Sequence, residues 1–470
     1  MLPAWGSLCR LLSATPEGTV HDGSGRAWSH ADIVKAAAGI ATNLRAAGIT
    51  PNEPIHLSVA NRAADLAMLF GIWQAGGVAV PLHASAAEAT RAAVRAQTRA
   101  RFHVTGDALQ LIADTPPEER VLLNGAALIV FTSGSTGKPK GVVIGHDRFA
   151  AKLDVLQNLL SLSADDTVVL PLQLIFIFGL WVALLSLKTG ARLEFIGKFS
   201  STGLRTRLGG ATVLAAVPSM LRTFFADGVT QAPYLRIILT GGESLGASLS
   251  TEIARQLPRT GVYDLYGLTE TGSCDFCLRP DDAAAGMNTI GRPTEHVAYR
   301  IHIDEQKRSS HEAAEGELLI RSPFCMLGYL DNPDLTTDSF VDGYFRTGDI
   351  ARERPGGRVE IVGRLKEIIS RGGNKIAPTE IEIVLNGHPG VAQALCAGVP
   401  DERLGEALHA AVVLKAGAIA DSKTIREWCR ERIEHFKVPD VIHLVDALPT
   451  GPTGKALRAG VKALAQAGPK

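Results

Sequence analysis

The chain has 470 residues, of which 46% are hydrophobic and 20% charged, so it can bury more than one core and is too long for one ordinary domain. Its 48 basic residues balance 48 acidic ones, which excludes a global field toward nucleic acid or an anionic membrane and favours small-molecule partners. Six cysteines scattered from Cys9 to Cys429 favour a reduced, cytoplasmic location, and Arg10 interrupts the apolar stretch where a signal peptide would lie.

Short β-rich runs alternate with amphipathic helical stretches over about the first 300 residues, which predicts sheets covered on both faces by helices. Ser29 is expected to cap a helix whose apolar face contains Ile33, Ala37, Ile40 and Leu44. Strands are expected at residues 55–59, 127–131, 212–215, 235–239 and 262–265.

The uncharged run from Val168 to Leu187 is long enough for a transmembrane helix. Pro171 and Gly179 divide it into a short strand, a loop and a helix that begins near Leu180. We therefore predict a buried strand–loop–helix without stable membrane insertion, with membrane contact of this run as the alternative.

The pattern changes near Ile361, where a Gly- and Arg-containing segment at 362–366 precedes a compact tail. Pro378 suits the first turn of a helix that runs through Leu385. Strands at 391–399, 410–414 and 441–445 and a helix at 422–433 complete a small α+β module. The predicted fold class is α/β, with a large N-terminal domain of β-sheets covered by helices (residues 1–364) and a smaller α+β C-terminal domain (residues 365–470).

Residues 131–141, directly after a predicted strand, read Phe-Thr-Ser-Gly-Ser-Thr-Gly-Lys-Pro-Lys-Gly. Glycines let backbone N–H groups converge on an oxyanion, while hydroxyls and lysines add donors and charge, so the segment predicts a phosphate-binding loop. It is not the common nucleotide P-loop, because Pro139 follows Lys138, and a mobile Ser/Gly linker is the alternative. The candidate phosphate-binding residues are Thr132, Ser133, Gly134, Ser135, Thr136, Gly137, Lys138 and Lys140.

This loop resembles that of the superfamily of adenylate-forming enzymes, which comprises acyl-CoA synthetases, luciferases and peptide-synthetase adenylation domains. The resemblance recurs in order along nearly the whole chain. The matching motifs are Gly241-Gly242-Glu243, Tyr266-Gly267-Leu268-Thr269-Glu270, Tyr344-Phe345-Arg346-Thr347-Gly348-Asp349, Gly363 to Lys366, and Pro449 to Lys455.

The resemblance implies an ATP site. Adenine would lie between the turn Gly241-Gly242-Glu243 and Tyr266, because small residues admit a flat ring and the phenol offers it a face. Asp349 would accept hydrogen bonds from both ribose hydroxyls, and Arg364 would reach the ribose or the phosphates. Taken singly, Asp349 could be a turn aspartate and Tyr266 a core aromatic.

The same resemblance implies the groups that act in adenylation. Glu270 would hold Mg²⁺, and Thr269 would donate to the α-phosphate. The substrate carboxylate and the α-phosphate repel each other unless positive charge is preorganised between them, and Lys455 is the predicted cation. The alternative for Lys455 is a solvated lysine of the C-terminal tail.

For transfer to the thiol, the family rotates its mobile C-terminal domain about a hinge, and Lys366 occupies the hinge position. The segment 370–375 would then approach the pantetheine channel, where Gly372 and Gly373 leave room for a thin chain. No dedicated base for the thiol is visible, because the segment from Leu172 to Gly179 lacks the histidine that many relatives carry there.

We expect Phe176, Phe178, Gly179, Gly267 and Gly272 to line the acyl pocket. An uncharged loop offers no cation to a second carboxylate, which favours an apolar aryl or aliphatic monoacid. The nearby Cys274 and Cys277 have metal or redox spacing, but one pair cannot complete a tetrahedral site, so we predict small core or pocket residues.

The predicted function is therefore an ATP-dependent carboxylic acid–CoA ligase that uses ATP, Mg²⁺ and coenzyme A. Lys366 and the run 376–382 favour the CoA-ligase branch. The alternative acceptor is the phosphopantetheine thiol of an acyl carrier protein. A catalytically silent nucleotide-binding module is a further alternative, against which Lys455, Glu270 and Asp349 argue.

Overall fold

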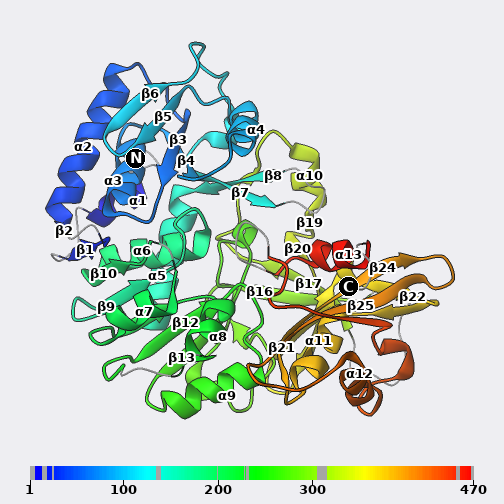
Figure 1. Cartoon of the computed structure of the whole chain (residues 1–470). Coiled ribbons are helices and arrows are strands. Elements are labelled where there is room, and N and C mark those ends of the chain that lie inside the picture. The colour runs from blue at the N-terminus through cyan, green and yellow to red at the C-terminus, as the bar shows by residue number, and fades with distance from the viewer. Residues whose placement is uncertain are drawn as a thin grey trace.

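The structure is a computed structural model, and it describes residues 6–12, 18–23, 26–133, 139–197, 199–226, 228, 232–303, 315–450 and 456–466. Two large sheets form most of the N-terminal part, with helices between them and on their outer faces (Figure 1). Two smaller sheets follow along the chain. The predicted α/β class is thereby confirmed.

The first large sheet has the strand order β18-β8-β7-β4-β3-β5-β6. Its strands β3, β4, β5 and β7 are parallel neighbours, while β8 returns antiparallel to β7. The bounds are β3 (Pro54–Val59), β4 (Val78–His83), β5 (Phe102–Thr105), β6 (Ala108–Leu111), β7 (Ala126–Ser133), β8 (Pro139–Gly145) and β18 (Gly328–Tyr329). Its helices are α2 (His30–Ala46), α3 (Ala63–Gln74), α4 (Glu88–Thr98) and α5 (His146–Leu160), and η2 spans Val121–Leu123.

Helix α2 shows how closely the local sequence specifies its element. Ser29 accepts from the Asp32 N–H while the Asp32 carboxylate accepts from the Ser29 N–H, which satisfies two donors that the first helical turn leaves unpaired. The predicted apolar face is buried, with Ile33 and Leu44 both fully covered.

The second large sheet has the order β15-β14-β13-β12-β11-β9-β10-β1-β2, in which β1 and β9 to β13 are parallel. The bounds are β1 (Thr19–His21), β2 (Ala27–Ser29), β9 (Thr167–Leu170), β10 (Arg192–Phe195), β11 (Val213–Ala215), β12 (Ile237–Gly241), β13 (Gly261–Tyr266), β14 (Phe276–Leu278) and β15 (Arg292–Pro293). The helical segments are α1 (Gly6–Cys9), η1 (Arg10–Leu12), α6 (Ile177–Thr189), α7 (Ser201–Leu208), α8 (Pro218–Ala226), α9 (Ala247–Gln256), η3 (Thr269–Thr271) and η4 (Pro280–Asp282).

Both faces of this second sheet are covered, as the sequence predicts. Helices α3, α5 and α6 contribute to one continuous core between the two large sheets. Leu208, Phe224 and Ile253, from α7, α8 and α9, pack with the other face in a separate core. The carboxyl ends of the parallel strands therefore open at one edge, where α/β sheets bind their ligands.

The uncharged run from Val168 to Leu187 forms β9, a loop and α6, as predicted. The helix begins at Ile177, three residues earlier than Leu180, because Gly179 fits inside its first turn. Most of its side chains, including Trp181 and Leu184, are buried between the large sheets. Among the described residues, no helix is both long enough and apolar enough to cross a bilayer.

A third sheet, which the sequence did not predict, follows the second large one. Its order is β16-β17-β20-β19, and β21 pairs with β20. The bounds are β16 (Ala298–His302), β17 (Glu315–Arg321), β19 (Phe340–Val341), β20 (Tyr344–Arg354) and β21 (Arg358–Arg364), with α10 at Pro333–Asp338. In the pairing of β20 with β21, Asp349 lies opposite Arg364.

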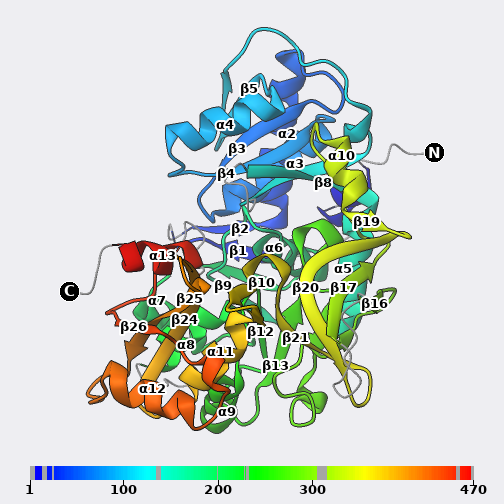
Figure 2. The ribbon, with the colours of Figure 1, turned by 90° about the vertical axis from the view of Figure 1, so that its right-hand side faces the viewer.

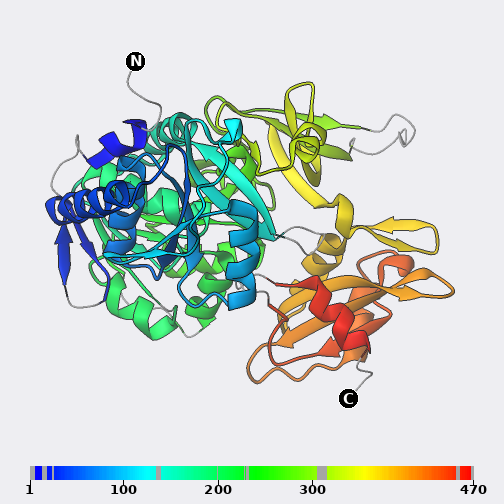
Figure 3. The same cartoon turned by 90° about the horizontal axis from the view of Figure 1, so that it is seen from above.

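The C-terminal elements form the fourth sheet and its helices, and Figure 3 shows them apart from the blue-to-green portion of the chain. They bury a core of their own around Ile381, Val412 and Ile425. The bounds are η6 (Leu365–Glu367), β22 (Ile369–Arg371), β23 (Asn374–Ile376), α11 (Pro378–Asn386), β24 (Val391–Asp401), β25 (Gly405–Leu414), α12 (Ser422–Arg430), η7 (His435–Lys437), β26 (Val441–Leu444) and α13 (Arg458–Gln466). The predicted α+β character of this module is confirmed.

Candidate active site

The predicted phosphate-binding loop connects the two strands of a β-hairpin. Strands β7 and β8 pair as far as Ser133 and Pro139. Lys140 lies in β8, opposite Thr132, and not in the loop as the sequence suggested, because the hairpin pairing continues past it. Gly134, Ser135, Thr136, Gly137 and Lys138 lie outside the described residues.

The glycine turn follows β12 at the carboxyl edge of the second sheet. Gly241 lies opposite Leu265 of β13, and a Cβ on Gly241 would lie 2.3 Å from the Leu265 carbonyl oxygen. Gly242 has a φ of +82°, which favours glycine. The glycines therefore let the turn pass close to the end of β13, where Tyr266 lies.

Glu243 is engaged with helix α8. Its carboxylate accepts hydrogen bonds from the Ser219 N–H (3.1 Å) and hydroxyl (3.0 Å) and lies 3.5 Å from an Arg222 guanidinium nitrogen. These contacts hold the turn against the start of helix α8. Glu243 thus fixes the backbone of the turn.

Tyr266, Asp349 and Arg364 come together from two different sheets. The Tyr266 hydroxyl donates to one oxygen of Asp349, and the Arg364 Nε donates to the other at 2.6 Å. Burial raises the pKa of Asp349, although Arg364 and Tyr266 oppose that shift. Burial and the adjacent carboxylate raise the pKa of Tyr266, so the phenol keeps its proton.

Asp349 keeps hydrogen-bond acceptor capacity for a further pair of hydroxyl groups. Asp349 is only 1% exposed, yet each carboxylate oxygen holds two acceptor positions, and Tyr266 and Arg364 occupy one on each. Each oxygen can therefore still accept a hydroxyl proton. The structure brings the three predicted residues together, over 83 residues of sequence between Tyr266 and Asp349.

Thr269 and Glu270 lie in η3, within the loop that follows β13. The Tyr329 hydroxyl donates to one Glu270 carboxylate oxygen at 3.0 Å. The Lys140 ammonium lies 5.3 Å from the centre of the same Tyr329 ring. The end of the phosphate-loop hairpin and the predicted metal carboxylate therefore flank one tyrosine.

The rest of this loop is packed tightly on itself. A Cβ on Gly267 would lie 2.4 Å from the Cys274 amide nitrogen, and one on Gly272 would lie 2.8 Å from the Phe324 carbonyl oxygen. Gly272, Ser273 and Cys274 all have positive φ, at 89°, 67° and 50°. Packing and backbone conformation thus account for both predicted pocket glycines.

Lys152 of α5 braces this loop and was missed by sequence reasoning. Its ammonium is fully buried and donates to the Cys274 carbonyl at 2.7 Å. It also faces Asp275, whose pKa burial raises to about 6 against the opposing charge of Lys152. In sequence Lys152 looks like an ordinary helical lysine, so no local signal could have found it.

Cys274 and Cys277 are both buried, which confirms their interpretation as core residues. Burial raises the pKa of the Cys274 thiol to about 12. Across the described ranges, no group of three or more His, Cys, Asp or Glu side chains could hold a metal ion.

Asp264 is a second residue that sequence reasoning missed. It lies on β13 two positions before Tyr266, so both side chains lie on the same face of the strand. Across the pairing it lies opposite Thr240, whose hydroxyl is buried without a hydrogen-bond partner among the described residues. Side chains alternate between the two faces of a strand, so counting back two positions from Tyr266 could have identified Asp264 from the sequence.

Burial raises the pKa of Asp264 from 3.8 to about 7, so its ionisation should oppose folding. The wild-type chain should then lose stability as the pH rises from about 4 through about 7, because the folded state holds the proton longer than the unfolded state does. Asp264→Asn should unfold at the wild-type temperature at pH 4 and roughly 2–6 °C higher at pH 8. Thermal unfolding across this range checks it, with exposed Asp107→Asn as control; parallel curves for both proteins would contradict it.

The predicted residues of the acyl pocket divide into two places. Phe176 caps α6, Phe178 stacks on Trp181 with the ring centres 5.4 Å apart, and a Cβ on Gly179 would lie 2.5 Å from the Gln173 carbonyl oxygen. Gly267 and Gly272 lie in the loop after β13. Phe178 from the first place and Leu268 from the second both pack against the core between the large sheets.

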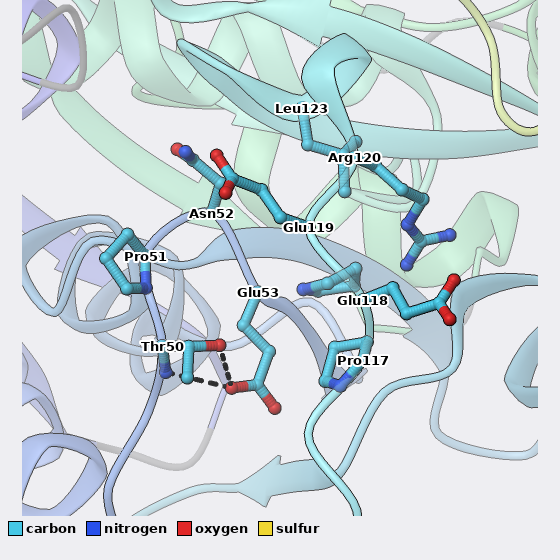
Figure 4. A pocket seen from close by; sticks show the side chains of 10 residues that line it. Thr50, Pro51, Asn52, Glu53, Pro117, Glu118, Glu119, Arg120 and Leu123 are labelled. Carbon is cyan, nitrogen blue, oxygen red and sulfur yellow. Dashed lines mark hydrogen bonds between the residues drawn. The ribbon is translucent and has the colours of Figure 1, made fainter.

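A cleft of about 250 Å³ lies elsewhere, near the start of β3 (Figure 4). Its wall includes Glu53, whose carboxylate pairs with Arg101 at 2.8 Å and accepts from Thr50, so the charge is already balanced. None of the predicted site residues lines this cleft.

Arg458, the first residue of α13, connects the segment after the predicted catalytic loop to the segment that contains the hinge position. Arg458 donates to Glu367 at 2.7 Å, beside Lys366 in η6, and also pairs with Glu382 of α11. Lys455 lies outside the described residues. The base of its loop is closed, because Thr450 bridges Ala456 and the Leu457 N–H donates to the Pro449 carbonyl at 2.8 Å.

Gly372 and Gly373 form the two-residue turn between β22 and β23, with φ of +56° and +82°. Two positive φ values in succession are the conformation of a tight hairpin turn and require such residues. Arg371 pairs with Asp440 and holds the base of the hairpin. The backbone conformation of this turn thus explains why both residues are glycine, in addition to the predicted need for space for pantetheine.

Comparison with known proteins places the chain. A family described as AMP-binding enzyme matches residues 12–330, and the AMP-binding enzyme C-terminal domain matches residues 380–455. The chain is 30% identical to the fatty acid–[acyl-carrier-protein] ligase ScoC of Streptomyces coeruleorubidus, over 92% of this chain and 91% of that one. It is 34% identical to the 2-succinylbenzoate–CoA ligase of Bacillus licheniformis, over 72% of this chain and 70% of that one.

Solved structures show the same fold. ATP-bound MatB from Rhodopseudomonas palustris superposes with a TM-score of 0.85 at 23% identity, covering 98% of both chains. The amide bond synthetase McbA from Marinactinospora thermotolerans superposes with a TM-score of 0.87 at 25% identity, covering 98% of this chain and 99% of that one. The chain therefore belongs to the AMP-binding enzyme family, within the adenylate-forming superfamily, and is an AMP-forming acid–thiol ligase.

Proposed function

We propose that the chain couples ATP to an apolar aryl or aliphatic monocarboxylic acid as an acyl-AMP and then transfers the acyl group to coenzyme A. The observation that carries this proposal is the convergence of Tyr266, Asp349 and Arg364 at the end of β13. In the loop after that strand, Glu270 contacts Tyr329, whose ring faces Lys140. That arrangement supplies a ribose acceptor and charges of both signs near the phosphate-loop hairpin.

The residues that would meet the nucleotide follow from this geometry. Asp349 would bind the ribose, and Asp264 together with the Gly241-Gly242-Glu243 turn would border the adenine. Glu270 is the carboxylate that would hold Mg²⁺, which when bound neutralises charge on the phosphates. A hard oxygen donor with one of its two oxygens engaged by Tyr329 fits that ion.

Adenylation would begin with the substrate carboxylate attacking the α-phosphorus of ATP. A new oxygen–phosphorus bond forms and the bond to pyrophosphate breaks, with Lys455 stabilising the charge between the two anions and Thr269 donating to the α-phosphate. In the second step the thiol sulfur bonds the acyl carbon, AMP leaves, and the thiol proton passes to solvent.

Coenzyme A is the acceptor we favour, because Lys366 and the run 376–382 follow the CoA-ligase pattern. Relatives with acceptors of both kinds support the general reaction: a feruloyl-CoA synthase of an Amycolatopsis species is 29% identical over 96% of this chain and 97% of that one, and ScoC is named for a carrier protein. Transfer to a carrier-protein phosphopantetheine thiol is therefore the second candidate.

The test is ATP-dependent AMP release over a panel of aryl, short, medium and long-chain acids, with coenzyme A or a holo-carrier protein as acceptor. We expect release with coenzyme A and an apolar monoacid. AMP release with holo-carrier protein but not with coenzyme A would show that the carrier protein is the acceptor. The absence of acid-dependent ATP–pyrophosphate exchange with every acid would refute the ligase function itself.

Monoacids should exceed matched dicarboxylates in kcat/KM by at least about tenfold, because an apolar pocket leaves a second carboxylate unpaired. The segment that begins α6 offers only Phe176, Phe178 and neighbouring uncharged residues. Hexanoate compared with adipate measures the difference, and the monomethyl ester of adipate is the control, since it restores neutrality at similar length. A clear preference for malonate or succinate would contradict the apolar pocket.

A further inference from the structure

Residues 322–330, here called the strap, cross from the loop that carries Glu270 to the strand that follows the phosphate loop. At the first end, the Met326 N–H donates to the Glu270 carbonyl at 2.7 Å. The Ser322 hydroxyl donates to the Thr271 carbonyl at 3.4 Å. The strap is therefore hydrogen-bonded to the backbone of Glu270 itself and of the residue that follows it.

At its other end the strap joins the first large sheet as strand β18, beside β8. The Leu327 N–H donates to the Val143 carbonyl at 2.7 Å, and the Leu330 N–H donates to the Gly141 carbonyl at 2.8 Å. Gly141 directly follows Lys140. Helix α10, which follows the strap, lies beside β8 in Figures 1 and 2. One short segment thus fixes Lys140 and Glu270 relative to each other.

Tyr329 is the strap residue whose side chain lies between those two charges. Its hydroxyl donates to Glu270 at 3.0 Å, and its ring faces the Lys140 ammonium at 5.3 Å. The Tyr329 N–H donates to the Thr336 hydroxyl at 2.9 Å, which anchors the residue from α10. Its side chain is 5% exposed, so the hydrogen bond to Glu270 is sheltered from water.

We propose that Tyr329 is a positioning residue that orients the Glu270 carboxylate for the divalent cation of the nucleotide. The phenol holds one oxygen in place, which leaves the other directed to the ion, and removing such outer-sphere donors typically weakens metal binding tenfold or more. The proposal rests on the proposed function in one respect, namely that Glu270 is the metal carboxylate.

Tyr329→Phe isolates this role, because it removes the hydroxyl and keeps the ring. The affinity of the full chain for α,β-methylene-ATP is measured by calorimetry with EDTA and again with saturating Mg²⁺, so no turnover contributes. We expect the gain in affinity from Mg²⁺ to fall by about tenfold, while the affinity in EDTA stays unchanged. In acid-dependent pyrophosphate exchange, raised Mg²⁺ should restore the rate.

Tyr344→Phe is the matched control, since Tyr344 is also 5% exposed and belongs to β20, where its ring faces Arg300 and Arg321. In the Glu270→Gln background, Tyr329→Phe should have no further effect on the Mg²⁺ gain, because the two side chains act through one contact. Thr336→Val displaces Tyr329 without removing its hydroxyl and should shift the gain in the same direction by a smaller factor. It serves if Tyr329→Phe does not fold.

Equal loss of affinity with and without Mg²⁺ would show a merely structural tyrosine and would overturn the proposal. So would an unchanged Mg²⁺ gain in a folded Tyr329→Phe chain. Both outcomes presuppose a wild-type chain that performs acid-dependent exchange. Failure of that exchange in the wild type refutes the proposed function instead, so the two failures are distinguishable.

Discussion

Lys455→Ala should slow acyl-AMP formation by on the order of 10²–10³ or more, while thioester formation from supplied acyl-AMP is much less affected. The reason is electrostatic: the first transition state brings a carboxylate against a phosphate, and the second does not. The structure fixes the base of the Lys455 loop through the Thr450–Ala456 bridge and the packing of Gly460 on Pro449, so the substitution should leave the fold intact.

Pyrophosphate exchange measures the first half-reaction, and acyl-CoA formation from synthetic acyl-AMP measures the second. Lys462→Ala, on the exposed side of α13, is the control for loss of a nearby lysine. Equal losses in both half-reactions would show that Lys455 does not act specifically in adenylation.

Lys366→Pro should retain acid-dependent pyrophosphate exchange and lose most acyl-CoA formation, even from supplied acyl-AMP. Lys366 lies in η6, between the last strand of the third sheet and the first strand of the C-terminal module. Proline would fix φ near −65° and restrict Leu365 as well, so one orientation of the module should be trapped without change to the phosphate-loop hairpin. If proline instead favoured the orientation used for thioester formation, exchange would be lost and acyl-CoA formation retained, so the two half-reactions would still separate.

Ala416→Pro provides a matched control within the C-terminal module. Ala416 occupies the second position of a turn in which the Ala418 N–H donates to the Lys415 carbonyl and Gly417 has a φ of +75°, a turn that accepts proline there. Its two rates should match the wild type. Rates within about twofold of wild type in a folded Lys366→Pro chain would exclude a required rotation about this residue.

Local patterns predicted most of the elements that surround the site. The capping box at Ser29, the alternation of buried strands and the split of the run 168–187 are short-range signals, and each gave the right element. Lys140 was placed in a loop because its glycine and proline neighbours suggest one, whereas cross-strand pairing with Thr132 decides its conformation. The sequence does not predict the third sheet, in which β19 has only two residues and β20 carries polar side chains over most of its length.

Contacts between distant segments explain what sequence reasoning could not supply. Lys152 and Cys274 are 122 residues apart, and Tyr329 and Glu270 are 59 apart. Each interaction depends on where two elements are placed in the fold, and no residue pattern around either partner encodes that placement. Asp349 and Tyr266 were found only because both lie in motifs that resemble those of a family.

The ion pairs of Arg458 set the point at which the C-terminal module could be exchanged with that of a relative. Two acids, Glu367 and Glu382, face one guanidinium that is 18% exposed. A recombination junction between Glu367 and Arg458 would take these partners from different parents and could leave a largely buried charge without its counterpart, which is strongly destabilising. A hybrid enzyme should therefore be joined before Glu367, so that both acids and their base are inherited together.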